Sequence, residues 1–305
     1  MTKGWAAFLA LALLVVWTVQ AGARTQSSDP SQLKQGAYPL HVTVMTFNLR
    51  RAGLDQGENA WVFRKDAAAH AIADVAPDIV VTQEADLGML NDMMERVPGY
   101  DWLGVNRGAN LTPEYSGAIL YRTDRLQVVA AGQFWLSLTP EDPGSTYPGI
   151  VHPRLANWVR FRIRHSLEEF VVYGTHLDHR SQAAREHGAS MIREHVERAR
   201  DLWGLPVIVA GDMNADPSNE AIRKLRMTTD GQELLRDAAD WHRARGGRVG
   251  ATFHGFRGIV TGLPIDYVLY SKGWDVAGYG IYDDRVDGRF PSDHYPVWAT
   301  LAFAR

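Results

Sequence analysis

Short apolar segments alternate with amphipathic ones along nearly the whole chain, and this alternation is the strongest constraint on its fold. Apolar runs rich in β-branched and aromatic residues predict strands, and apolar residues at helical spacing predict helices. Because the strands outnumber the helices, the pattern favours an α/β fold with two packed β-sheets covered by helices. Strands are predicted at 42–47, 79–81, 118–121, 126–131, 158–163, 170–173, 206–210, 265–270 and 296–303, and helices at 61–75, 87–97, 181–203, 217–225 and 234–241.

The first 38 residues differ from the rest of the chain. Lys3 precedes an apolar run at 6–17 and a small-residue site at 21–23, the pattern of a cleavable signal peptide over residues 1–23. Residues 24–38 are polar and indicate a linker, and the alternating pattern then continues without interruption, which predicts one domain over 39–305. We therefore expect a secreted or periplasmic protein without stable membrane insertion. An uncleaved N-terminal anchor is the alternative.

Composition narrows the chemistry. The chain has 305 residues and no cysteine, which excludes thiol nucleophiles, zinc–thiolate sites and disulfide scaffolds. Its formal net charge of −3 gives no overall attraction to nucleic acid, although some nucleases are acidic. No serine lies in a G-x-S-x-G elbow, so water activated by a metal or a carboxylate is the remaining nucleophile.

Polar side chains gather at the ends of the predicted strands, where α/β folds place their sites. Carboxylate and amide oxygens are the ligands that Mg²⁺ or Mn²⁺ prefers, and histidines beside them can bond phosphate oxygens. On an extended chain, residues two apart such as Asp212 and Asn214 point the same way, although the same pair can form an Asx turn. The strand-end residues are Asn48, Glu84, His176, Asp212, Asn214, Asp266, Asp293 and His294.

Six ordered segments carry a resemblance to a known family: TFNLR (46–50), TQEAD (82–86), YGTHLD (173–178), AGDMNADP (210–217), IDYVL (265–269) and PSDHYPV (291–297). Together they resemble the endonuclease/exonuclease/phosphatase superfamily, which has the deoxyribonuclease I-like fold, and in particular a bacterial, often secreted subgroup. The resemblance implies a four-layer α/β sandwich with mixed sheets. It also implies divalent-metal-dependent hydrolysis of a phosphoester substrate.

The resemblance also implies a role for each motif residue. Glu84 would be the main metal ligand, with Asn48 and Asp293 beside it. Asp212 would orient and deprotonate the attacking water, and Asn214 would hold that water or a phosphate oxygen. His294, held by Asp266, and His176 would bind the phosphate.

One position departs from the deoxyribonuclease pattern. Two residues after the family glutamate, DNA-cleaving members carry Arg or Lys, whereas this chain has Asp86. The departure argues against DNA as the substrate. The substrate contacts that we expect are Arg50, Tyr115, Asp178 and His254, although Asp178 could instead cap the following helix. Phe253 could stack on a base or sugar, but packing in the core is the favoured interpretation.

Three functions are compatible with these residues. The first is a secreted phosphodiesterase or phosphatase that uses Mg²⁺, or Mn²⁺, and acts on a small or lipid-linked phosphoester as a monomer. The second is a secreted nuclease that degrades DNA or RNA. The third is a non-catalytic binding module on the same fold, which the intact set of motif residues disfavours.

Overall fold

The structure is a computed structural model that describes residues 40–107, 114–258 and 261–304. The signal peptide predicted at 1–23 and the linker predicted at 24–38 lie outside these residues. No helix in the described ranges is long and apolar enough to cross a membrane.

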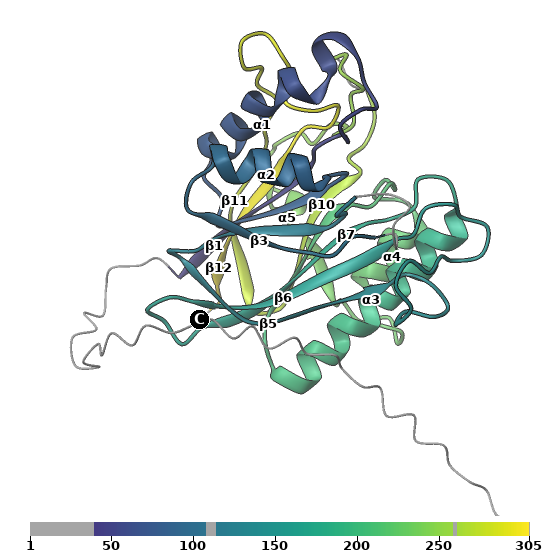
Figure 1. Ribbon diagram of the computed structural model, residues 1–305. Coiled ribbons are helices and arrows are strands. Elements are labelled where there is room, and N and C mark those ends of the chain that lie inside the picture. The colour runs from purple at the N-terminus through teal and green to yellow at the C-terminus, as the bar shows by residue number, and fades with distance from the viewer. Residues whose placement is uncertain (1–39, 108–113, 259–260, 305) are drawn as a thin grey trace, which may run out of the picture.

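Two six-stranded mixed β-sheets pack face to face (Figure 1). Within each sheet, one pair of strands is parallel (β1 with β2, and β7 with β8) and the remaining pairs are antiparallel. The first sheet has the order β11-β12-β1-β2-β4-β3 and contains β1 (His41–Asn48), β2 (Ile79–Gln83), β3 (Tyr100–Leu103), β4 (Ala118–Arg122), β11 (Trp274–Ile281) and β12 (Val297–Phe303). The second has the order β5-β6-β7-β8-β10-β9 and contains β5 (Leu126–Trp135), β6 (Leu155–Ile163), β7 (Glu169–His176), β8 (Val207–Asp212), β9 (Leu235–Asp237) and β10 (Asp266–Ser271).

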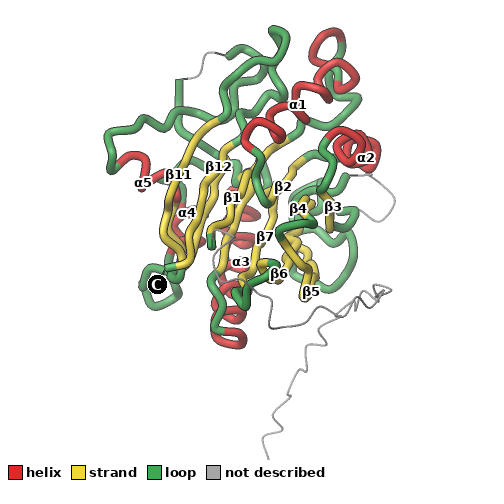
Figure 2. The backbone as a smooth tube through the Cα atoms, turned by 90° about the vertical axis from the view of Figure 1, so that its left-hand side faces the viewer, coloured by secondary structure: helices red, strands yellow, loops and turns green. Residues whose placement is uncertain are grey.

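Helices cover the outer face of each sheet, as Figures 1 and 2 show. The helices α1 (Trp61–Val75) and α2 (Leu87–Arg96) pack on the first sheet, and α3 (Gln182–Trp203) and α4 (Glu220–Arg226) pack on the second. A 3₁₀ turn, η2 (Gly57–Asn59), precedes α1, and α5 (Ala238–Arg243) contacts β10 and β11. Three apolar cores fill the space between the four layers, with one core between the sheets and one under each helical layer. The predicted four-layer α/β sandwich is thus confirmed.

Two predicted helices begin later than expected. The helix predicted at 217–225 starts at Glu220, because the Asn219 side chain accepts from the backbone N–H of Ala221 and caps the helix there. The helix predicted at 234–241 is partly wrong, because Leu235–Asp237 pairs with β10 as a short edge strand. Asp237 then caps α5 by accepting from the Ala239 N–H.

The strands β3 and β11 were not predicted. Both lie at an edge of the first sheet, where a strand has one neighbour and can expose half of its residues. Gly278 and Gly280 also weaken the apolar alternation of β11, and its pairing with β12 shifts register between Val276 and Gly278.

The two sheets approach each other closely at Gly117, just before β4. A Cβ added to Gly117 would lie 2.6 Å from the carbonyl oxygen of Gly174 in β7, and the φ of Gly117 is +73°.

Gly117→Ala should therefore lower the free energy of unfolding by about 2–5 kcal/mol, because it adds a steric clash to the left-handed strain. Gly231→Ala is the matched control, since its φ is +82° and nothing lies within 4 Å of the added Cβ. Its cost should be only about 1–2 kcal/mol. Equal losses for the two variants in urea denaturation would contradict a close contact between the sheets.

Candidate active site

Strand register brings the motif residues of each sheet to one edge. In the second sheet, His176 at the end of β7 pairs with Asp212 at the end of β8, and Asp212 pairs with Asp266 at the start of β10. In the first sheet, Asn48 at the end of β1 lies beside the end of β2, which Glu84 follows. The two edges meet, because the Asn48 Nδ2 donates to Asp212 Oδ2 at 3.1 Å.

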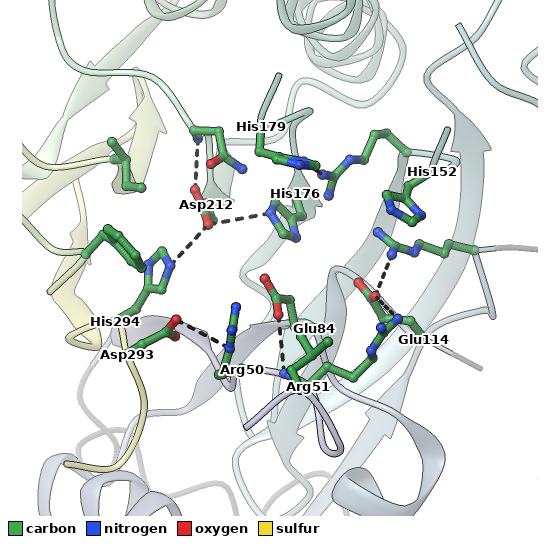
Figure 3. Close-up of a pocket in the computed structure, with 16 residues that line it drawn as sticks. Arg50, Arg51, Glu84, Glu114, His152, His176, His179, Asp212, Asp293 and His294 are labelled. Carbon is green, nitrogen blue, oxygen red and sulfur yellow. Dashed lines mark hydrogen bonds and ion pairs between the residues drawn. The ribbon is translucent and has the colours of Figure 1, made fainter. Parts of the chain in front are cut away.

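A pocket of about 370 Å³ opens where these edges meet (Figure 3). Glu84 lies near its centre, with Asp212, Asp293 and His294 on one side and His152 and Glu114 on the other. Its described lining residues are Arg50, Arg51, Leu54, Glu84, Arg107, Glu114, His152, Arg154, His176, His179, Asp212, Asn214, Phe253, Ile265, Asp293 and His294.

A buried imidazole lies between two carboxylates on the first side of the pocket. His294 Nδ1 is 2.9 Å from Asp266 Oδ2, and His294 Nε2 is 3.8 Å from Asp212 Oδ2. Burial alone would lower the pKa of His294, but the charges of Asp266 and Asp212 outweigh burial and raise this pKa to about 10. The ring is therefore a cation that can donate a proton from Nε2 into the pocket.

Asp212 is almost fully buried, and burial together with the charge of Asp266 raises its pKa to about 7. A carboxylate with this pKa can take a proton from water near neutral pH. Its Oδ1 accepts from the backbone N–H of Asn214 at 2.8 Å, which is an Asx turn. Asn214 thus reaches the pocket through a left-handed turn, with φ +47°, and not along an extended strand.

Two further carboxylates, those of Glu84 and Asp293, line the same pocket. Glu84 Oε1 is 3.4 Å from Asn48 Nδ2, and Asp293 Oδ2 is 3.6 Å from Arg50 Nε. Burial raises the pKa of Asp293, and the nearby charge of Glu84 adds to this effect. Both carboxylates offer oxygens to the pocket, and such oxygens fit a hard dication. The Asn48 oxygen accepts from the Arg50 N–H, so its amide hydrogens face the carboxylates.

A more compact cluster is formed by Asp212, Asp266 and His294. One ligand atom from each of the three lies within 4.8 Å of the others, so among the described residues this trio could hold a metal by geometry. The chemistry fits less well, because a protonated His294 has no free lone pair. The donor set of Glu84 and Asp293 suits Mg²⁺ better, since it consists of oxygens.

Strained backbone and a buried arginine position the loops of this side. Arg50 and Glu84 both have left-handed φ, +55° and +59°, which non-glycine residues rarely adopt. Arg64 from α1 donates to the carbonyls of Leu49, Arg50 and Pro291, and so ties together the loops that carry Arg50 and Asp293. The sequence did not identify Arg64, because its partners are backbone groups that leave no motif.

The opposite side of the pocket is basic. Arg107 is buried and pairs with Glu114, with 2.6 Å between Nη2 and Oε2. Arg154 is also buried, and its Nη2 donates to His179 Nδ1 at 3.1 Å. Sequence analysis missed His152, Arg154 and His179. His179 directly follows a motif and could have been found, whereas nothing in the sequence marks His152 or Arg154.

The predicted site residues divide into three groups by their position. Asn48 and Asp266 lie behind the pocket wall and contact lining residues. Those that line the pocket are Arg50, Glu84, His176, Asp212, Asn214, Asp293 and His294. Three expected substrate contacts, Tyr115, Asp178 and His254, are not among the lining residues.

Each of these three has a structural contact instead. Tyr115 packs edge-on against Trp102 with 5.3 Å between ring centroids. Asp178 accepts from the backbone N–H groups of Arg180 and Ser181 at the start of α3. His254 stacks on Tyr295 at 4.1 Å. The core packing expected for Phe253 is wrong, because this side chain is 48% exposed and lines the pocket.

The fold and the site together define a class of protein. Two packed mixed sheets carry acidic and imidazole groups at one edge, without a cysteine or a serine elbow for covalent catalysis. This arrangement is typical of hydrolases that use water and a divalent metal.

Comparisons with known proteins agree with this class. The model of the Endonuclease/Exonuclease/phosphatase family matches residues 45–294. A family member from Bacteroides thetaiotaomicron is 31% identical, with a TM-score of 0.77 over 88% of this chain and 97% of that one. A mannosyl-6-phosphatase from the same species is also 31% identical, with a TM-score of 0.76 over 86% and 100%. The human nocturnin catalytic domain, with bound sulfate, is 20% identical, with a TM-score of 0.67 over 88% and 96%, and shares the fold. No curated protein matches the chain significantly.

The chain belongs to the endonuclease/exonuclease/phosphatase family. It is a hydrolytic phosphoesterase, and the enzymes of this family depend on a divalent metal.

Proposed function

We propose that this protein is a Mg²⁺-dependent phosphoesterase that hydrolyses a small phosphoester by in-line attack of water. The observation that carries the proposal is the pocket that brings Asp212, His294 and Asp293 together on one side, with Glu84 near its centre. Mn²⁺ offers the same coordination preferences and is expected to substitute.

The residues have complementary roles in this proposal. Asp212 accepts the proton of the attacking water, and its burial keeps the pKa near neutrality. His294 donates from Nε2 to a phosphate oxygen while Asp266 holds its ring through Nδ1. Burial and the charge of Arg154 lower the pKa of His176, so its neutral ring donates a hydrogen bond without adding charge. Glu84 and Asp293 would hold the metal, which would neutralise charge on the phosphate oxygens. Asn48, expected as a third ligand, instead donates its amide hydrogens to Asp212 and Glu84.

The size and chemistry of the pocket favour a small substrate. A volume of about 370 Å³ lies near the lower end of the range of small-molecule sites, roughly 300–1,000 Å³. The named activity of one 31% identical structure, a mannosyl-6-phosphatase, supports a phosphorylated sugar. Asp86 provides no phosphate contact for a nucleic acid, because its Oδ1 caps α2 by accepting from the Met89 N–H.

A nuclease is the second candidate, and Phe253 is the observation that favours it. This exposed ring lies 5.0 Å from the His294 ring, where an unpaired base could stack beside the reacting phosphate.

A substrate panel separates the two candidates. The protein is incubated with Mg²⁺ and, separately, mannose 6-phosphate, inositol phosphates, sphingomyelin, supercoiled DNA and RNA. We expect phosphate release from a small phosphoester and intact nucleic acid, and we expect His294→Ala to abolish the release. Nicked DNA or shortened RNA without release from small phosphoesters would instead establish the nuclease.

We also propose export across the cytoplasmic membrane, with cleavage after Ala23. The support is the N-terminal pattern of charge, apolar run and small residues. N-terminal sequencing of the exported protein tests the cleavage site, and a mature chain that still begins at Met1 would contradict it.

A further inference from the structure

The basic side of the pocket has more guanidinium N–H donors than the nearby carboxylates accept from. Arg154 is 4% exposed, and its Nη1 has no hydrogen-bond partner in the described part of the chain. The Nε of buried Arg107 is likewise unpartnered there. A buried guanidinium that lacks a partner for one of its donors has lost hydration at that atom without compensation. Such a donor in a pocket wall indicates a ligand group.

The neighbours of Arg154 hold it in place and leave Nη1 free. Its Nε is 3.5 Å from Asp178 Oδ2, and its Nη2 donates to His179 Nδ1. Asp178 is itself held by two backbone N–H groups, so it fixes the position of the guanidinium. Because His179 accepts at Nδ1, its ring is neutral and carries its proton on Nε2. Burial also lowers the pKa of His179, and the charge of Arg154 adds to this effect.

The charge balance on this side favours an anion. Arg51 and Arg107 share one carboxylate, since Arg51 Nη1 is 3.7 Å and Arg107 Nη2 is 2.6 Å from Glu114 Oε2. Arg154 adds a third guanidinium that lines the pocket, whereas its partner Asp178 is not a lining residue. The basic side therefore keeps an excess of positive charge facing the pocket.

This excess lies apart from the group that would bind the reacting phosphate. Figure 3 shows His294 and Asp212 on one side of the pocket, and His152 and Glu114 across it, with His176 and Glu84 between them. A reacting phosphate held by His294, with its attacking water on Asp212, leaves the basic side available for another part of the same molecule.

We propose that Arg154, with Arg107 and Arg51, forms a second anion subsite, and that the substrate is a small phosphoester with a second anionic group, either phosphate or carboxylate. The proposal rests on the proposed function for the reacting phosphate, but the subsite itself does not depend on hydrolysis. Planar guanidinium groups bind both anions through paired N–H donors.

Three substrates with the same 1-phosphate test the specificity and distinguish the two anions. Glucose 1-phosphate has no second anionic group, glucuronic acid 1-phosphate adds a carboxylate, and glucose 1,6-bisphosphate adds a phosphate. With Mg²⁺ present, we expect the KM of at least one doubly anionic substrate to be about 10- to 100-fold below that of glucose 1-phosphate, with similar kcat. Arg154→Gln should raise that KM by the same factor and leave the KM of glucose 1-phosphate nearly unchanged.

Two further variants separate the subsite from effects on folding. Arg51→Gln, at a partly exposed position, should also raise the KM of the doubly anionic substrate relative to that of glucose 1-phosphate. Arg162→Gln is the matched control, because this arginine lies on β6 and pairs with Glu169 away from the pocket. An equal fall in kcat for all three substrates in Arg154→Gln would overturn the proposal, since Arg154 would then hold the reacting phosphate.

A binding measurement gives a readout without catalysis. Inorganic phosphate is titrated into metal-free protein in EDTA by calorimetry. We expect binding by the wild type and by His294→Ala, and about 10- to 100-fold weaker binding by Arg154→Gln. Wild-type affinity in Arg154→Gln would overturn the subsite. If none of the sugar phosphates is hydrolysed but phosphate binding still requires Arg154, the subsite holds and the proposed substrate class of the catalytic site fails.

Discussion

Asp212→Asn is expected to lower kcat by about 100- to 10,000-fold while the protein stays folded. Asparagine has nearly the same shape and its one oxygen can keep the hydrogen bond from Asn48 or from the Asn214 N–H, but it cannot accept a proton from water. Rates of phosphate release at saturating substrate measure the effect. Asp216→Asn is the matched control, because Asp216 lies on the same loop and bonds only Ser218 among the described side chains. Wild-type kcat in Asp212→Asn would remove Asp212 from the mechanism.

The same variant should change how stability depends on pH. Burial and Asp266 raise the folded-state pKa of Asp212 to about 7, above its ordinary value of 3.8. The stabilisation from this group is therefore fully present below about pH 4, and is lost as the pH rises through 7. Without metal, the free energy of unfolding should fall less steeply over this range in Asp212→Asn than in Asp216→Asn. Equal slopes in urea titrations would show that Asp212 ionises normally.

Removal of the divalent metal is expected to reduce activity by more than about 1,000-fold, and added Mg²⁺ should restore it. The metal would neutralise the repulsion among carboxylates that lie close together, so it should also stabilise the fold. At a Mg²⁺ concentration about 100 times Kd, the gain of about 2.7 kcal/mol corresponds to a rise in Tm of roughly 5–10 °C. Thermal denaturation in EDTA and in Mg²⁺ measures this rise.

Glu84→Gln decides which cluster holds the metal. If Glu84 is the main ligand, the variant should lose both the activity and the rise in Tm, whereas Glu58→Gln, at an exposed position in η2, should keep both. A full rise in Tm in Glu84→Gln, together with no rise in Asp212→Asn, would instead assign the metal to Asp212, Asp266 and His294.

Patterns among neighbouring residues predicted most helices and strands, and also the side of the pocket that carries the motif residues. The helix α1 has the bounds that its spacing and Pro77 predicted, and the register of β7 and β8 brings His176 beside Asp212. The errors arose where the pattern was weak or was compatible with both a helix and a strand. Leu235 fits a helix or a strand equally well, and its pairing with Ser271 in β10 selects the strand.

The basic half of the site could not be predicted in this way. Arg154 carries no motif, and an arginine in a sequence is most often solvated at the surface. Its burial depends on Asp178 and His179, which come from the next turn of chain beyond β7. Arg64 presents the same difficulty, since its carbonyl partner Pro291 lies 227 residues away.

The sequence alone determined the layered α/β architecture, the family and the residues able to carry out hydrolysis, because periodicity, helix caps and short motifs are properties of neighbouring residues. Only the tertiary structure decided which of these groups face the pocket, that His294 is a cation between two carboxylates, and that Arg154 has a free donor there. The physical reason is that charge state and hydrogen-bond satisfaction depend on burial and on distant partners, which exist only after the two sheets have packed together.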